Sequence, residues 1–196
     1  MKKKYLINEI FYSVQGEGRW TGRPAIFIRF SGCNLRCPFC DTDFSKKTPM
    51  SIDEILAKIA EWEQCRFIVL TGGEPTLQVD NDFIEIMHGY GYTVAIETNG
   101  TREVPSNIDW ITVSPKAAYV ENGKVWVTYA DEVKVVYDGV HEVSDFNIQT
   151  NYLYVQPCDT GDPIRNQEII RKTVEFIKKN PQWSLSLQTQ KILNVR

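Results

Sequence analysis

Short runs of β-branched and aromatic residues recur along the chain, and most of them end directly in glycine, proline and polar residues. Residues 67–70 continue into Thr71-Gly72-Gly73-Glu74-Pro75, and residues 93–96 continue into Glu97-Thr98-Asn99-Gly100. Such runs occupy residues 26–30, 67–70, 93–96, 108–113, 133–137, 152–155 and 185–187. Polar turns can simply follow strands, but ordinary turns would not so often carry Glu, Thr, Asn and Lys together. Because a parallel α/β barrel places its chemistry at the carboxyl ends of its strands, the pattern favours such a barrel.

Three segments have the apolar spacing of helices. Ser51 and Glu54 form a capping box before residues 52–62, and helical spacing also covers residues 80–89 and 166–179. A chain of 196 residues with three helices is too short for eight β/α units. We therefore expect an α/β fold in one domain, residues 1–196: an incomplete, modified TIM-like barrel with about six parallel strands and three main helices. Asn122-Gly123 also predicts a tight hairpin between residues 119–120 and 125–127.

Charge and hydropathy narrow the class of partner. The 22 basic and 25 acidic residues give a net charge of −3, without the basic excess that holds a phosphate backbone. Lys2, Lys3 and Lys4 are followed by Asn8 and Glu9 before any apolar signal segment develops. No run of about 18 apolar residues occurs. We therefore expect no nucleic acid or membrane as partner, and a cytoplasmic location.

Three of the five cysteines, Cys33, Cys37 and Cys40, stand within eight positions. An odd number of cysteines in a chain without a targeting signal indicates metal or redox chemistry and not a disulfide framework. Three thiolates this close can bind three irons of a [4Fe-4S] cluster and leave the fourth iron open. The alternative is a structural zinc site that adds Cys65 or Cys158. The chain has only two histidines, which makes a two-histidine zinc finger or a Ser-His-Asp hydrolase unattractive.

The cysteine loop resembles that of the radical S-adenosylmethionine superfamily. The members share its C-x3-C-x2-C spacing with an aromatic residue before the last cysteine, which is Phe39 here. Residues 71–75 match the GGE motif that contacts the methionine amino group of the cofactor. The resemblance implies that the open iron binds the methionine part of S-adenosylmethionine, and that one electron cleaves the cofactor to a 5′-deoxyadenosyl radical.

Five further segments are similar to the 7-carboxy-7-deazaguanine synthase family. They are residues 9–18 (EIFYSVQGEG), 22–25 (GRPA), 97–100 (ETNG), 114–116 (SPK) and 40–44 (CDTDF), which ends in Phe44. Members of this family have a trimmed α/β barrel and form homodimers. They are lyases that convert 6-carboxy-5,6,7,8-tetrahydropterin into 7-carboxy-7-deazaguanine with loss of ammonia, in queuosine and deazapurine biosynthesis. The resemblance implies the same reaction here, with a [4Fe-4S] cluster, S-adenosyl-L-methionine, Mg²⁺ and an external electron donor such as flavodoxin.

The resemblance also assigns the site residues. Cys33, Cys37 and Cys40 would hold the cluster, and Thr42 would bind Mg²⁺. The cofactor site would comprise Phe39, Cys40, Asp41, Gly73, Glu74, Ser114, Pro115, Lys116, Gln156, Pro157, Cys158 and Asp159. The substrate site would comprise Val14, Gln15, Gly16, Glu17, Arg29, Thr71 and Arg196.

Residue chemistry supports some of these assignments and leaves alternatives open. Arg29 offers a bidentate guanidinium to a carboxylate, but an arginine in mid-strand equally suits a structural ion pair. Gln15 and Glu17 can recognise the donor edge of a 2-aminopyrimidinone ring. Thr42 can supply an oxygen ligand to Mg²⁺ or cap its own turn.

Two positions depart from the family pattern. Gln190 stands where members have histidine, and Arg196 stands where they end in proline. Glutamine keeps a hydrogen bond but loses a titratable proton. The terminal carboxylate reaches the substrate in that family, so Arg196 would present its main-chain carboxylate while its guanidinium points elsewhere.

Two other functions stay open at this point. A glycyl-radical activating enzyme would share the cluster loop but act on a protein chain. A non-catalytic iron-sulfur or zinc-binding module would share only the cysteines. The Gln-Gly-Glu stretch at residues 15–17 and Thr42 favour a small-molecule substrate.

Overall fold

The computed structural model describes residues 3–43 and 45–196, and its central feature is one sheet of nine strands. The strand order across this sheet is β3-β1-β2-β4-β5-β6-β7-β8-β9. The strands are β1 (Tyr5–Val14), β2 (Pro24–Phe30), β3 (Thr48–Met50), β4 (Phe67–Gly72), β5 (Thr93–Thr98), β6 (Trp110–Val113), β7 (Glu132–Tyr137), β8 (Tyr152–Pro157) and β9 (Trp183–Leu185). Lys2 and Phe44, which the sequence analysis named, lie outside the described residues.

Seven strands of the described chain, β2 and β4 to β9, are parallel to one another. β1 and β3 extend the sheet beyond β2 with antiparallel pairing, so the sheet ends at β3 and β9 and stays open. The expected incomplete α/β barrel is confirmed, with one parallel strand more than the six expected. β1 was not expected because Asn8 and Glu9 interrupt its apolar pattern, and the register indeed shifts between Ile7 and Glu9.

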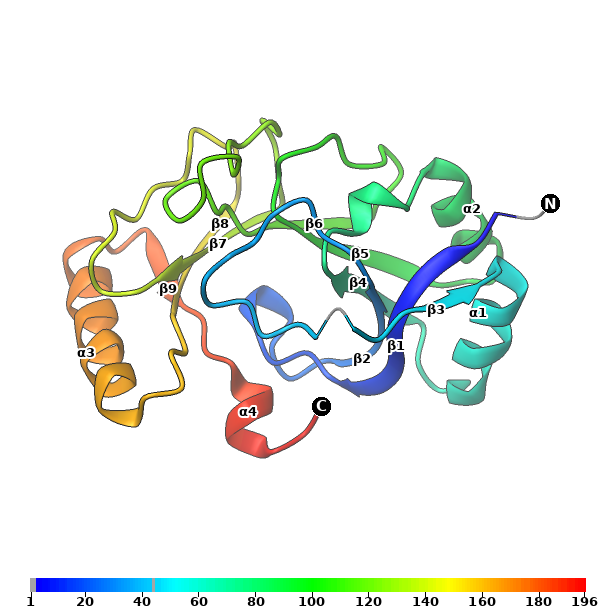
Figure 1. Cartoon of the computed structure of the whole chain (residues 1–196), viewed down its shortest axis with the longest axis horizontal. Coiled ribbons are helices and arrows are strands. Elements are labelled where there is room, and N and C mark those ends of the chain that lie inside the picture. The colour runs from blue at the N-terminus through cyan, green and yellow to red at the C-terminus, as the bar shows by residue number, and fades with distance from the viewer. Residues whose placement is uncertain (1–2, 44) are drawn as a thin grey trace.

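The main helices lie outside the ends of the curved sheet, with α1 (Ile52–Ile59) and α2 (Asn81–Gly89) at one end and α3 (Pro163–Lys179) at the other (Figure 1). The capping box before α1 is confirmed, because Ser51 and Glu54 each accept the other's backbone N–H. α3 begins three residues earlier than expected, because Asp162 caps it and proline suits its first turn. A short helix, α4 (Thr189–Leu193), carries the chain towards its C-terminal end. No helix in the described ranges is long and apolar enough to cross a membrane.

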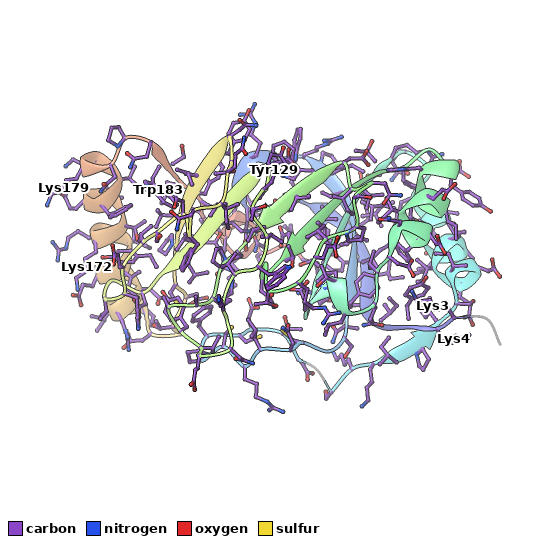
Figure 2. The ribbon with its side chains drawn as sticks, turned by 90° about the horizontal axis from the view of Figure 1, so that it is seen from above. Lys3, Lys4, Tyr129, Lys172, Lys179 and Trp183 are labelled. Atoms are coloured by element: carbon purple, nitrogen blue, oxygen red, sulfur yellow. The ribbon has the colours of Figure 1, made fainter. Side chains whose placement is uncertain are left out.

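Buried apolar side chains form two clusters that hold the strands together. The first joins β1, β2, β4 and β5 to α1 and α2, and it includes Ile28, Leu70 and Phe83. The second lies along β6 to β9 against α3, where Trp183 meets Phe176 with ring centroids 6.2 Å apart. Figure 2 shows Trp183 between α3 and the strands, with the α3 lysines at that end of the molecule. The two clusters fix the parallel strands so that their carboxyl ends share one edge.

The hairpin expected around Asn122-Gly123 is wrong. Gly123 N–H donates to Val120 O and closes a turn, but the residues on either side form no strand. The N–H groups of Trp126 and Val127 instead donate to Gly100 O, in the loop after β5. Local turn chemistry is present, but the tertiary contact decides which backbone groups pair. The last strand also lies two residues before the expected 185–187, because Trp183 pairs with Leu153 of β8.

Candidate active site

A pocket of about 560 Å³ lies at the carboxyl ends of the parallel strands. Arg29 of β2, Thr71 of β4, Glu97 of β5, Lys134 of β7 and Gln156 of β8 line it. Residues 33–42 form one wall, and residues from the C-terminal segment 188–196 form another. The strand ends therefore converge on one cavity, as the recurring polar endings predict.

Most residues assigned from the sequence line this pocket. They are Val14, Gln15, Gly16, Glu17, Arg29, Cys33, Cys37, Phe39, Cys40, Asp41, Thr42, Thr71, Gly73, Ser114, Lys116, Gln156, Pro157, Cys158, Asp159 and Arg196. The assigned residues outside the lining are Glu74 and Pro115. Pro115 is buried between Ser114 and Lys116, which do reach the cavity.

Glu74 does not present its carboxylate to the pocket, contrary to the expectation that it contacts the cofactor's ammonium. The side chain is fully buried, and Oε1 accepts hydrogen bonds from Thr76 N at 3.1 Å and from Thr98 Oγ1 at 2.7 Å. Oε2 accepts from Asn99 N at 2.8 Å. These bonds tie the loop after β4 to the loop after β5. Glu74 therefore shapes the two loops and does not line the cavity.

The turn before Glu74 requires glycine. Gly72 has a φ of +118°, and a Cβ added there would lie 2.3 Å from the carbonyl oxygen of Phe30. A side chain would therefore meet both backbone strain and a clash with β2. Gly72 lets the loop after β4 approach β2 closely, and Gly73 N–H then donates to Phe30 O.

Cys33, Cys37 and Cys40 all reach the pocket as free thiols. Burial raises the pKa of Cys33 and of Cys37, so both thiols are neutral unless a metal stabilises their thiolates. Within the described part of the chain, no three His, Cys, Asp or Glu side chains converge closely enough to form a ready metal site. The three sulfur donors on one pocket wall fit a [4Fe-4S] cluster in number and chemistry.

Neighbouring side chains fix the cysteine loop. Asn99 Nδ2 donates to Asn34 Oδ1 at 3.0 Å, and Asn122 Nδ2 donates to Asn34 O at the same distance. Phe39 packs edge-on against Tyr119 with ring centroids 4.7 Å apart. Loops after β5 and β6 thus hold the cysteine loop against the pocket.

The fourth ligand of the alternative zinc site is not available from Cys65. That thiol lies at the other ends of the strands, where Pro24 O and Phe67 O are within 3.7 Å and 3.5 Å of its sulfur. Cys158 is buried and does line the pocket, on the wall formed by the end of β8. Of the two remaining cysteines, Cys158 therefore lines the same pocket as the cluster loop, and Cys65 does not.

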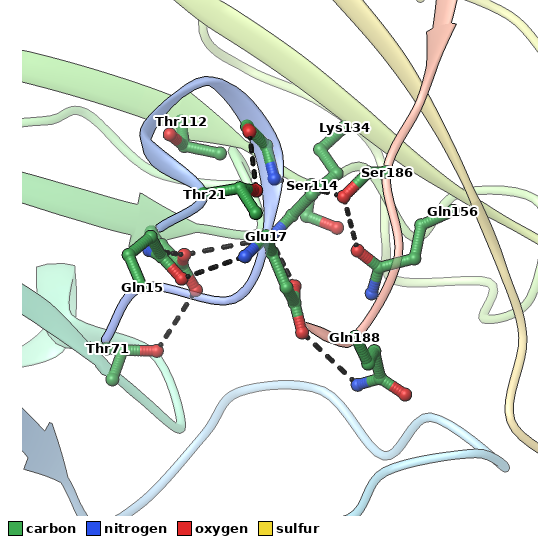
Figure 3. Close-up of polar contacts among 12 residues, drawn as sticks. Gln15, Glu17, Thr21, Thr71, Thr112, Ser114, Lys134, Gln156, Ser186 and Gln188 are labelled. Carbon is green, nitrogen blue, oxygen red and sulfur yellow. Dashed lines mark hydrogen bonds and ion pairs between the residues drawn. The ribbon is translucent and has the colours of Figure 1, made fainter. Parts of the chain in front are cut away.

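Glu17 is the centre of a polar network that lines the pocket (Figure 3). It forms an ion pair with Lys134, and its Oε1 accepts from Gln190 Nε2 at 2.9 Å and Gln188 Nε2 at 3.2 Å. Burial disfavours the charged carboxylate, but Lys134 and the two amides outweigh it and hold the pKa of Glu17 at about 2. Glu17 is therefore a carboxylate at neutral pH.

Glu97 joins a second set of side chains to this network. Its Oε1 accepts from Gln15 Nε2 at 3.0 Å, and its Oε2 accepts from Thr71 Oγ1 at 3.3 Å. Figure 3 shows Gln15 and Thr71 on the same side of Glu17. Gln190 Oε1 is buried without a hydrogen-bond partner in the described chain, so it is available to a ligand N–H group. This wall of the pocket is therefore rich in acceptors.

Arg29 forms a structural ion pair, as one of the two alternatives predicts, and it also lines the pocket. Its Nε donates to Glu9 Oε1 at 3.1 Å, and Glu9 Oε2 accepts from Arg196 Nη2 at 2.8 Å. The main-chain oxygen of Arg196 accepts from Ser13 Oγ. Arg196 thus holds its guanidinium at Glu9 and its main chain at Ser13.

Lys191 fastens α4 over the pocket. Its ammonium lies 2.8 Å from Asp159 Oδ2 and 3.6 Å from Asp41 Oδ2. Hydrogen bonds from Lys191, from the Gly161 backbone and from an asparagine hold the pKa of Asp159 at about 2. The ion pairs connect the end of β8 and the cysteine loop to the C-terminal segment.

Sequence reasoning did not assign Lys134, Glu97, Gln188 or Lys191 to the site. The available signals were a lysine within the β-branched run 133–137 and a glutamate directly after the run 93–96. Lys134 is buried and Glu97 half-buried, and both line the pocket. Burial of a charged side chain is a property of the folded chain, so the sequence alone did not distinguish it.

Comparison with known proteins agrees with this geometry. Residues 27–177 match the radical SAM superfamily. The chain is 46% identical to a 7-carboxy-7-deazaguanine synthase of Bacteroides thetaiotaomicron, covering 97% of this chain and 98% of that protein. It is 36% identical to the Haemophilus influenzae protein of the same name, covering 96% and 93%. The crystal structure of QueE from Escherichia coli superposes with a TM-score of 0.76 at 29% identity, covering 95% of this chain and 94% of that one. The chain therefore belongs to the radical SAM superfamily and, within it, to the 7-carboxy-7-deazaguanine synthase family.

Proposed function

We propose that this chain converts 6-carboxy-5,6,7,8-tetrahydropterin into 7-carboxy-7-deazaguanine with release of ammonia, as a radical lyase of queuosine or 7-deazapurine biosynthesis. The observation that carries the proposal is one pocket with three thiols on one wall and the Glu17–Lys134 network on another. Such an arrangement suits a cofactor on the thiol side and a polar heterocycle on the other. In the same proposal, residues 1–196 form a single domain.

Cofactors of the radical SAM family are a [4Fe-4S] cluster and S-adenosylmethionine. In our proposal Cys33, Cys37 and Cys40 hold the cluster. S-adenosylmethionine lies against Phe39, Asp41, Gly73, Ser114, Lys116, Gln156, Pro157, Cys158 and Asp159, all of which line the pocket. When bound, these groups supply radical chemistry that begins with one-electron cleavage of the cofactor.

The chain's own residues bind and orient the pterin. Gln15, Glu17 and Gln190 offer acceptors to the N–H groups of a 2-aminopyrimidinone ring. Arg29 is held by Glu9 through Nε, which leaves its two terminal nitrogens for a substrate carboxylate. Val14, Gly16, Thr71 and Arg196 complete the substrate side. Fixing a rigid bicyclic ring in this way places one reacting carbon beside the cofactor side of the pocket.

Several finer assignments belong to the same proposal. Thr42 lines the pocket beside Asp41 and offers a hydroxyl oxygen, so we assign Mg²⁺ to it together with substrate oxygens and water. The electron comes from an external donor such as flavodoxin, and the chain acts as a homodimer. Its thiols and cluster suit the reducing cytoplasm.

Anaerobic turnover tests the function directly. Protein reconstituted with iron and sulfide is incubated with 6-carboxytetrahydropterin, S-adenosylmethionine, reductant and Mg²⁺, and the product is identified by mass spectrometry. We expect the deazaguanine and one ammonia per product. Cys33→Ala is the matched control. Cleavage of S-adenosylmethionine without any conversion of the pterin would overturn the proposed substrate, and omission of Mg²⁺ tests its requirement.

A further inference from the structure

Lys134 is a buried cation surrounded by carboxylates from three parts of the chain. Its side chain is only 5% exposed, and its ammonium is ion-paired with Glu17 and lies 3.6 Å from Glu97 Oε1. Glu132, two residues earlier on the same face of β7, is also buried. Glu17 comes from the segment after β1, and Glu97 comes from β5. One lysine therefore has three carboxyl groups around it, of which Glu17 and Glu97 line the pocket.

The other cations near the pocket contact groups other than Glu17 and Glu97. Lys116 donates to the carbonyl and hydroxyl of Ser114 at 2.6 Å. Burial lowers the pKa of Lys116 to about 8, although the neighbouring Cys37 favours its charged form. Arg29 is committed to Glu9, and Lys191 to Asp159 and Asp41. Among the described residues, Lys134 is the cation that contacts Glu17 and Glu97.

These two carboxylates in turn orient the groups that face a ligand. Glu17 accepts from the amides of Gln188 and Gln190, and Glu97 accepts from Gln15. A protonated carboxyl would become a donor on one oxygen and could not keep this pattern. Ionisation of both groups is therefore a condition for the acceptor-rich wall.

We propose that Lys134 is a positioning residue for the substrate: its ammonium pairs with both Glu17 and Glu97 and holds their carboxylates oriented towards the ring N–H groups. The inference rests on the proposed function for the identity of the ligand. Burial disfavours the charged lysine, but the three carboxylates outweigh it and raise the pKa of Lys134. The lysine therefore stays charged throughout the pH range in which the enzyme is studied.

Removal of the ammonium leaves two close carboxylates without a counter-ion, and such a pair binds a proton. Ligand binding then has to release that proton, because the ring N–H groups need acceptors. Below the new pKa, affinity changes by up to about tenfold per pH unit. In the wild type Lys134 already balances both carboxylates, so affinity should depend less on pH than in a variant without the ammonium. Glu132, with a pKa of about 7, titrates in both proteins.

Binding of 6-carboxypterin, an oxidised analogue of the substrate whose aromatic C6 carries no hydrogen, measures this difference. Calorimetry uses the cluster-containing protein with S-adenosylmethionine between about pH 5.5 and 7.5, where the pterin keeps its ring N–H, in two buffers of different ionisation enthalpy. For Lys134→Met we expect binding that tightens as the pH rises, with release of about one proton per ligand near neutrality. Lys134→Arg keeps a cation and should restore the wild-type pH profile. Lys58→Met, which removes a surface pair with Glu61, is the matched control and should behave as wild type.

The outcomes separate the inference from the proposed function. A wild-type protein that does not bind the probe overturns the assigned substrate and the inference with it. Wild-type binding together with the same pH profile in Lys134→Met overturns the positioning role alone. If thermal melting shows that Lys134→Met is unfolded, Lys134→Gln replaces it, because the amide can still donate a hydrogen bond to Glu17. This variant also leaves the two carboxylates without a counter-ion, so it must show the same pH dependence for the inference to stand.

Discussion

Arg196 is ion-paired with Glu9, with Nη2 of Arg196 2.8 Å from Oε2 of Glu9 on β1. The other oxygen of this carboxylate accepts from Arg29 Nε at 3.1 Å. Both guanidinium groups lie near the Phe11 ring, at 6.0 Å for Arg29 and 5.6 Å for Arg196. The Glu9 carboxylate thus holds two guanidinium groups at the pocket wall. Arg29 is paired through Nε, whereas Arg196 is paired through the terminal Nη2.

Glu9→Gln is expected to raise KM for the pterin about fivefold with little change in kcat, because Arg29 loses the carboxylate that orients it; this corresponds to about 1 kcal/mol. Arg196→Ala is the companion variant. Its side chain is 69% exposed, and exposed ion pairs contribute about 0–1 kcal/mol, so KM should stay within about twofold of wild type. Steady-state kinetics measures both. A larger effect from Arg196→Ala than from Glu9→Gln would contradict this order.

Cys33→Ala, Cys37→Ala and Cys40→Ala should each abolish turnover, because three thiolates are needed to hold the cluster. Iron and sulfide per chain, together with the visible absorbance after anaerobic reconstitution, report the loss independently of activity. Cys65→Ala should retain cluster and turnover, since this buried thiol lies at the opposite ends of the strands. Pterin conversion by the triple variant would be incompatible with the assignment.

Gly16→Ala should displace the C-terminal segment from the pocket. A Cβ on Gly16 would lie 1.8 Å from Gln190 Oε1 and 2.7 Å from the backbone nitrogen of Gln190, so the backbone has to move as well as the side chain. We expect KM to rise at least about tenfold, because about 1.4 kcal/mol of lost binding corresponds to that factor. Faster proteolysis within residues 188–196 gives a second readout. The control is Gly89→Ala at the end of α2, where an added Cβ meets nothing within 4 Å; equal effects of the two variants would rule out the explanation.

Glu132 should make folding stability depend on pH between about pH 5 and 7. Burial raises the pKa of Glu132 from 4.5 to about 7, although Lys134 opposes this. A carboxyl whose folded pKa lies above its unfolded pKa stabilises the fold most at low pH, and this contribution is lost as the pH rises through the folded pKa. The loss from about pH 5 to 7 amounts to roughly 2 kcal/mol.

Denaturant unfolding of wild type and Glu132→Gln at the two pH values measures this contribution. The free energy of unfolding of wild type relative to Glu132→Gln should fall by the stated amount as the pH rises. The other carboxyls cancel in this comparison, and Glu17, with a pKa of about 2, titrates below the window. An unchanged difference between the two proteins would show that Glu132 does not titrate in this range.

Local sequence was sufficient for features that depend on neighbours in the chain. The capping box at Ser51, the C-x3-C-x2-C loop from Cys33 to Cys40 and the sharp turn at Gly72 follow from spacing and backbone geometry over a few residues. The order of strands and polar endings also indicated an open α/β barrel, because parallel strands put their carboxyl ends at one edge. These predictions needed no knowledge of distant contacts.

Distant contacts decided the remainder. The Asn122-Gly123 turn formed, but the flanking residues paired with Gly100 and not with each other. The loop that carries Glu74 was in the expected place, yet the Glu74 carboxylate turned inward to Thr98 and Asn99. In both cases the group that completed the hydrogen bonds was distant in the sequence, so the local motif did not indicate it.

By itself, the sequence determined the open barrel, the cluster loop and the resemblance to a radical enzyme family. Only the tertiary structure decided that Lys134, an ordinary lysine in a β-strand, is buried beside Glu17, 117 positions away. The physical reason is desolvation: a charge costs little in water and much in a protein interior, so its role follows from the groups that the fold places around it.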